Sequence, residues 1–239
     1  MKQSANLIID FIVFAFALAL SLDKKPNFYK HWKSMLVALI GTTLIIGFIE
    51  VYFVDRNILT FEKQWVGTGD YFGLPTVEWL SVFAFTFATI IIFQWLKVYT
   101  GRYYKNGGNY LFIGLGLFLV VTGNLNLSHI YAAVFFISSG LLLLLHVILL
   151  RSKYTGTFML TFLLILVVFI VDRVVLARLP VSQLQETSTT SLRFYGMPLE
   201  DMVFILLLSL IDITLYESSK RFLEGSKSSG RKRSSSGRD

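Results

Sequence analysis

The chain alternates between long apolar runs and short polar segments. Seven runs approach the length of a spanning helix, which needs about 20 mainly apolar residues. They cover residues 5–22, 35–54, 77–96, 109–126, 130–150, 156–176 and 200–217. The run at 109–126 has the weakest pattern, because it is short and contains Gly114 and Gly116. The pattern predicts an all-α membrane protein with seven transmembrane helices.

The composition supports this class. Of the 239 residues, 54% are hydrophobic and only 15% are charged, whereas about a quarter of a soluble domain is charged. The chain has no cysteine, which excludes disulfides and thiolate chemistry. It shows no Gly-rich phosphate loop, no dinucleotide fingerprint and no cluster with metal-ligand spacing, so neither a cofactor nor a metal is predicted.

The basic residues predict the orientation in the membrane. Sixteen of the 22 Lys and Arg residues lie in the segments 23–34, 97–108, 151–154 and the tail from 217. Lys and Arg favour the cytoplasmic side, so we expect an outer N-terminus and a cytoplasmic C-terminus in the cell membrane. The net charge of +7 therefore reflects topology rather than nucleic-acid binding. The Ser- and Lys/Arg-rich tail, 219–239, is predicted to be disordered.

Two stretches of the chain resemble each other. Phe72–Glu78 and Tyr195–Asp201 each carry Gly-x-Pro followed by acidic residues at the start of an apolar run. Each is preceded by a Val-Asp-Arg tripeptide: residues 54–56 close one apolar run, and residues 171–173 fall near the end of another. The order predicts two parallel three-helix repeats, which often place a membrane site at their interface. The expected divisions are a first repeat, a linking helix with its loops, a second repeat and the tail, at 1–96, 97–129, 130–218 and 219–239.

Acidic residues concentrate at one level of the predicted bundle. The repeat places five of them at the outer ends of the helices, and a sixth lies about one turn deeper: Asp55, Glu78, Asp172, Glu200, Asp201 and Glu50. Two interpretations remain open. Acids are common at helix starts, where the dipole stabilises them. Ionisable groups inside a membrane also tend to face the bundle interior and mark function, and a carboxyl group held protonated in low dielectric is a general acid.

Several motifs are similar to a known family. Leu20–Lys25 and Phe28–Lys33 resemble the first-helix exit of the integral-membrane lycopene cyclases of actinobacteria, archaea and fungi. Pro198–Asp201 is similar to the Pro-x-Glu-Glu/Asp motif of that family, and Leu215–Glu217 to the end of the same helix. The two repeats resemble the fused form of these enzymes. The first copy departs from the pattern, because Val77 stands where the family tends to have an acid.

The resemblance implies a carotenoid cyclase, an isomerase of the lycopene beta-cyclase type. A carboxylic acid would protonate the end group of a linear polyene, the cation would close a ring, and a base would remove a proton. No redox cofactor is required. By resemblance, Glu200 would be the proton donor, Asp201 its partner or the base, and Glu78 would complete the site. The supporting charges would be Asp55, Asp172 and Glu50. Aromatic rings near the motif would contact the substrate: Tyr52, Trp79, Phe83, Tyr195 and Phe204.

The expected partners are a lipid-dissolved carotenoid such as lycopene, membrane lipid, and a second copy of the chain or other enzymes of the pathway. A non-catalytic carotenoid-binding or assembly protein of the same fold is the main alternative, favoured by Val77. A proton-coupled transporter is a third, and the clustering of acids at one level argues against it. The cyclase hypothesis predicts that Glu78, Glu200 and Asp201 converge on one apolar cavity open to lipid.

Overall fold

The computed structural model describes residues 4–62, 69–100, 108–150, 155–176 and 182–235. These residues form seven helices of at least 18 residues, and each coincides with a predicted apolar run. They are α1 (Ser4–Ser21), α2 (Trp32–Asp55), α4 (Thr76–Thr100), α5 (Gly108–Leu125), α6 (Ile130–Leu150), α7 (Thr155–Leu176) and α8 (Leu199–Ser235). Two short 3-10 helices, η1 (Phe28–His31) and η2 (Glu186–Ser188), lie in loops. The helical class is confirmed.

The apolar helices support an integral membrane protein. Four segments of the described chain are long and apolar enough to cross a bilayer: Phe28–Asp55, Thr76–Thr100, Ile130–Ile148 and Thr155–Val175. Two apolar helical segments, Leu7–Ser21 and Asn109–Leu125, are shorter. Large apolar side chains are exposed on the outer helices, among them Phe11, Phe48, Phe118 and Val167, as expected of surfaces that face lipid. The number of seven spans stays a prediction.

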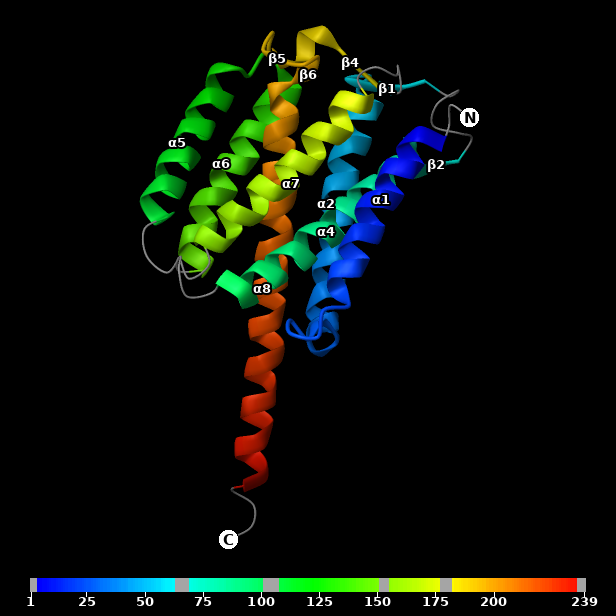
Figure 1. Cartoon of the computed structure of the whole chain (residues 1–239). Coiled ribbons are helices and arrows are strands. Elements are labelled where there is room, and N and C mark those ends of the chain that lie inside the picture. Colours follow the sequence, from blue (N-terminus) through cyan, green and yellow to red (C-terminus); the bar gives the residue numbers. More distant parts are fainter. Residues whose placement is uncertain (1–3, 63–68, 101–107, 151–154, 177–181, 236–239) are drawn as a thin grey trace.

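The last helix is longer than expected. The sequence predicted an apolar helix over 200–217 and a disordered tail over 219–239, but α8 continues to Ser235. Figure 1 shows its red end extending beyond the other helices. The helix therefore continues into the predicted tail, and the disorder predicted for residues 219–239 stays a prediction. Composition disfavours a new helix there, but extending an existing helix avoids the cost of nucleation.

Helices α4 and α8 form the centre of the bundle. α4 packs against α1, α2, α7 and α8, while α8 packs against α2, α4, α6 and α7. α5 lies outside, against α6. The central helices are apolar nearly all round, which is typical of a buried helix. Their fully or nearly fully buried side chains include Ile90, Ile91, Phe93, Ile205, Leu210 and Ile213.

A tight hairpin precedes each central helix. β2 (Asp70–Tyr71) pairs with β3 (Leu74–Pro75), and β5 (Arg193–Phe194) pairs with β6 (Met197–Pro198). The connecting residues have positive φ in both cases: 58° and 81° at Phe72 and Gly73, and 48° and 88° at Tyr195 and Gly196. Two successive positive φ values are the mark of a type I′ turn, which favours glycine. The two similar stretches of sequence therefore adopt the same local structure.

A third strand pair joins the loops that follow α2 and α7. β1 (Leu59–Phe61) runs antiparallel to β4 (Ser182–Leu184), with Leu59 opposite Leu184 and Phe61 opposite Ser182. The three strand pairs are the departure from the purely helical prediction. They lie at the same end of the bundle as the starts of α4 and α8 (Figure 1), and β1 and β4 cover the site described below.

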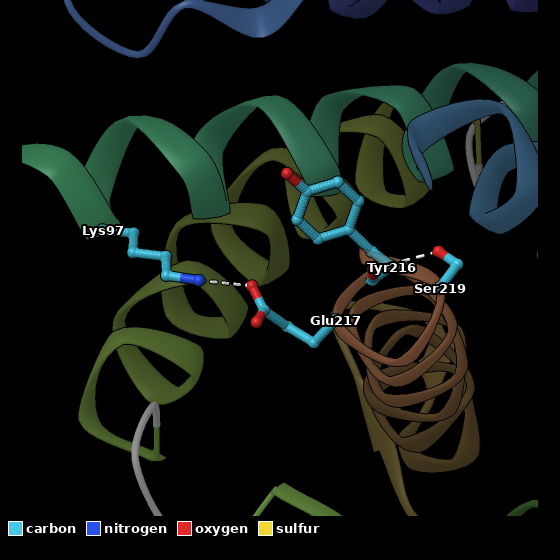
Figure 2. Close-up of polar contacts among 4 residues, drawn as sticks. All are labelled: Lys97, Tyr216, Glu217 and Ser219. Carbon is cyan, nitrogen blue, oxygen red and sulfur yellow. Dashed lines mark hydrogen bonds and ion pairs between the residues drawn. The ribbon is translucent and has the colours of Figure 1, made fainter. Parts of the chain in front are cut away.

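An ion pair joins the last turn of α4 to the middle of α8. Lys97 of α4 donates to the carboxylate of Glu217 of α8, as Figure 2 shows. The Glu217 side chain is 3% exposed. On the next turn of α8 the Ser219 hydroxyl donates to the carbonyl oxygen of Tyr216 at 3.0 Å. The ion pair therefore links α4 to α8 at a level far from the hairpins.

Replacing Gly47 by Val is expected to destabilise the bundle by about 1–3 kcal/mol or more. A Cβ at this position of α2 would lie 2.1 Å from Cζ3 of Trp79 on α4, so the Trp79 ring or the helices themselves would have to move. Thermal unfolding in detergent measures the effect. Gly114→Val is the matched control, because Gly114 is exposed and nothing lies within 4 Å of a Cβ added there. Equal melting temperatures for the two variants would contradict the packing.

Candidate functional site

A small buried cavity lies where α2, α4, α6, α7 and α8 meet beneath β1 and β4. We call it the central cavity. Its volume is about 40 Å³. It is lined by Glu50, Leu59, Phe61, Glu78, Tyr131, Phe169, Arg173, Ser182, Leu184, Asp201 and Phe204. Residues from both halves of the chain therefore meet at one place, and the β1–β4 pair supplies its cover.

Three carboxyl groups face this cavity. Glu78 is the third residue of α4 and Asp201 is the third residue of α8. The two acids therefore occupy the same position relative to the hairpin that precedes each helix. Glu50 comes from the last turns of α2. Each of the three is less than 8% exposed, and Oε2 of Glu50 has no hydrogen-bond partner among the described residues. The structure thus concentrates acidic groups in a buried space.

Arg173 and Tyr131 complete the polar wall. The Tyr131 hydroxyl donates to Oδ1 of Asp201 at 2.9 Å. Nε of Arg173 lies 3.8 Å from Oδ2 of Asp172, and its guanidinium carbon lies 5.0 Å from the ring centroid of Phe169. Among the described lining residues, Arg173 is the one with a positive charge. Three carboxyl groups therefore share one guanidinium.

Aromatic rings form the apolar wall. Phe204 meets Phe135 nearly at right angles, with centroids 5.3 Å apart, and Phe169 at 5.9 Å. Tyr131 meets Phe135 at 4.8 Å in the same edge-to-face manner. Aromatic faces carry negative electrostatic potential, so this wall can stabilise positive charge that develops beside it.

Glu200 and the two Val-Asp-Arg acids lie elsewhere. Glu200 is fully buried but does not line the central cavity. Its Oε1 accepts a hydrogen bond from the backbone N–H of Thr190, in the loop before the hairpin. Asp172 is buried beside Arg173, whereas Asp55 is exposed at the end of α2. Of the three acids expected to converge on one cavity, the structure brings together Glu78 and Asp201, and it adds Glu50.

The aromatic residues suggested by the sequence also separate. Phe204 lines the central cavity, and Phe83 lines a different groove between α1 and α4. Trp79 packs on Phe48 of α2 and donates from Nε1 to the carbonyl oxygen of Tyr71 at 3.3 Å. Tyr52 and Tyr195 are 43% and 78% exposed. These last three side chains do not line either space.

Sequence reasoning missed Arg173 and Tyr131 as lining residues. Arg173 was visible as a charged residue at the end of an apolar run, but its neighbour Asp172 made a local ion pair the simplest interpretation. Tyr131 lies at the start of α6, where an aromatic residue is common at the membrane interface. Nothing in the sequence indicates that its hydroxyl group contacts Asp201. Within the described ranges, no group of three or more acidic and histidine side chains is arranged to hold a metal ion.

Comparison with known proteins agrees with the resemblance seen in the sequence. Residues 128–218 match the family model described as lycopene cyclase. The matched segment runs from the start of α6 into α8 and includes Tyr131, Arg173 and Asp201. No curated protein and no solved structure matches the chain. The similarity to a lycopene-cyclase-like family is thus shown over this second part of the chain.

Proposed function

We propose that this lycopene-cyclase-like membrane protein closes the linear end group of a carotenoid, with lycopene as the substrate to test. The observation that carries the proposal is the meeting of Glu78 and Asp201 in one buried cavity with an aromatic wall. Acid-initiated cyclisation needs a carboxylic acid, a base and a surface that stabilises a carbocation, all shielded from water. The central cavity supplies groups of each kind, and the apolar helices suit a substrate dissolved in lipid.

We further propose that α1, α2 and α4 are one copy of a repeat and that α6, α7 and α8 are the other. The matching hairpins and the pairing of β1 with β4 support this. Aligning the hairpins places Val77 opposite Glu200 and Glu78 opposite Asp201. The aligned pair that faces the cavity, Glu78 and Asp201, is the position at which both copies have an acid. The missing acid at Val77 therefore falls opposite Glu200, a residue outside the cavity.

The charges favour a protonated carboxyl group in the central cavity. If Glu50, Glu78 and Asp201 were all ionised, one guanidinium, which also pairs with Asp172, would leave at least two negative charges uncompensated. Burying an unpaired charge costs several kcal/mol, so holding at least one group as the neutral acid is favoured. That acid can give its proton to an alkene carbon. A neighbouring carboxylate, kept ionised by Arg173, can accept a proton from the cyclised cation, so the reaction has no net redox change.

The decisive experiment is expression in a bacterium that accumulates lycopene, followed by chromatography of the pigments. Conversion of lycopene to a product with one or two rings is expected, with an empty vector as the control. The ring isomer and the number of closed ends are read from the same chromatogram. Unchanged lycopene, with the protein present in the membrane fraction, would overturn the proposal for this substrate.

One observation favours a second candidate, a non-catalytic carotenoid-binding protein of the same fold. The central cavity has room for a few water molecules only, since one water needs about 10–15 Å³ by this measure. A ring-sized end group does not fit there without side-chain movement. Lycopene that co-purifies with the protein but is never converted would support binding without catalysis.

A further inference from the structure

A second space on the bundle has the size that the central cavity lacks. An apolar groove of about 250 Å³ lies between α1 and α4, and we call it the α1–α4 groove. It is lined by Leu7, Asp10, Phe11, Phe14, Leu80, Phe83 and Ala84. Leu7, Phe11 and Leu80 are exposed, so the groove opens onto the lipid-facing surface. A dry cavity of about 150 Å³ accepts benzene, so this groove can accept a methyl-bearing six-carbon ring.

Asp10 is the polar exception among the described lining residues. Its side chain is buried, at 6% exposure, and its Oδ2 has no hydrogen-bond partner in the described part of the chain. Ser81, Asp172, Glu78 and Arg173 all lie close enough to the Asp10 carboxyl group to act on it electrostatically. Asp10 thus stands between the α1–α4 groove and the acids of the bundle centre.

We propose that the α1–α4 groove receives the end group of a linear carotenoid from the lipid and that Asp10 is the acid that faces it. The inference rests on the proposed cyclase function and changes one part of it: the end group lies in the α1–α4 groove, and the first proton comes from Asp10 rather than from an acid of the central cavity. The Asp10→Asn and Asp201→Asn variants distinguish the two positions of the donor. An unpaired carboxylate is costly in an apolar groove, so the neutral acid is favoured there. The O–H group of the neutral acid can donate its proton to a carbon–carbon double bond.

The reaction balances at this position. The O–H bond of Asp10 breaks and its proton adds to the inner carbon of the terminal double bond, which leaves a tertiary carbocation on the outer carbon that carries the two methyl groups. The next double bond attacks the cation, so a ring carbon–carbon bond forms and the charge moves into the ring. The Asp10 carboxylate left by the first step then removes a proton from the adjacent ring carbon, so that a double bond is restored and Asp10 is again the neutral acid. Phe14 and Phe83, with ring centroids 6.2 Å apart, can stabilise the cation through their faces.

The test compares two buried aspartates in the same lycopene-accumulating bacterium. Asp10→Asn is expected to reduce cyclisation by at least about 100-fold, the scale of general acid catalysis, and Asp10→Glu to restore part of it. Asp212→Asn is the matched control, expected within threefold of wild type. Asp212 is also fully buried with an unpartnered Oδ2, but it accepts a hydrogen bond from Thr42 and lines neither space. Immunoblots of the membrane fraction normalise each value.

A second pair of variants tests the groove itself. Leu80→Trp fills the groove and is expected to lower both conversion and the amount of lycopene that co-purifies. Ile12→Trp adds the same bulk to an exposed position of α1 outside the lining and is expected to leave both unchanged.

The outcomes separate the two proposals. An active wild type with Asp10→Asn within threefold of it overturns the role of Asp10 and leaves the cyclase function standing. Full activity and full lycopene retention in Leu80→Trp overturn the α1–α4 groove as the binding site and indicate that lipid alone occupies it. A wild type that converts no lycopene overturns the cyclase function, and the inference falls with it.

Discussion

Asp201→Asn is expected to reduce lycopene cyclisation by about 100-fold or more while the amount of protein in the membrane stays the same. The substitution removes a proton-transfer group from the central cavity, and such groups contribute about 10²–10⁴-fold to rates. The fold should survive, because the Asn amide oxygen can still accept the hydrogen bond that Tyr131 donates to Asp201. Chromatography of the pigments, normalised to protein by immunoblot, measures the effect.

Glu200→Gln is the control that distinguishes loss of an acid from the central cavity from loss of an acid elsewhere at the start of α8. Glu200 is adjacent to Asp201, but its carboxyl group accepts from the backbone N–H of Thr190 and does not line the central cavity. A Gln oxygen can accept the same hydrogen bond, so a much smaller loss of activity is expected. The opposite pattern, an inactive Glu200→Gln beside an active Asp201→Asn, would return the proton donor to Glu200, as the sequence motif predicted.

Arg173→Met is expected to destabilise the protein by about 3–5 kcal/mol, the usual cost of removing one partner from buried charges. Arg173 is the positive group among the lining residues of the central cavity, where Glu50, Glu78 and Asp201 converge, and it also pairs with Asp172. For a chain of this size the change corresponds to a fall in melting temperature of about 6–20 °C. Thermal unfolding in detergent, followed by circular dichroism, measures it.

Arg56→Met is the matched control for this variant. Arg56 occupies the corresponding place in the first Val-Asp-Arg, but it is exposed, with its guanidinium carbon 5.3 Å from the ring centroid of Tyr52. An exposed substitution of this kind is expected to change stability by no more than about 0.5 kcal/mol. If Arg173→Met were as mild as Arg56→Met, the charge arrangement of the central cavity would be wrong.

The hairpins show how far local sequence reaches. Gly-x-Pro followed by acids was read as a helix start, and both copies are helix starts. Glycine in both turns permits the second positive φ, and proline ends each hairpin before α4 and α8 begin. These properties depend on a few neighbouring residues, so the sequence alone predicts them. The same holds for the apolar runs, whose helices differ from prediction mainly where α8 continues beyond residue 217.

The choice among the acids could not be made in that way. Glu200 and Asp201 are adjacent in the sequence, yet successive side chains on a helix point about 100° apart. Only the packing of α8 decides that Asp201 faces the central cavity while Glu200 faces the Thr190 loop. Likewise Asp55 and Asp172 occupy matching sequence positions, but Asp55 is the last residue of α2 and is exposed, whereas Asp172 lies within α7 and is buried.

The sequence by itself therefore determined the helical membrane class, the two similar helix starts and the concentration of carboxyl groups near them. The tertiary structure decided which carboxyl groups share a space, and it brought Glu50, Tyr131 and Arg173 to Glu78 and Asp201 from separate helices. It also placed Asp10 in the α1–α4 groove, a position that no motif marks. Local periodicity and turn chemistry follow from neighbouring residues, whereas a site built from five helices depends on contacts between residues far apart in the chain.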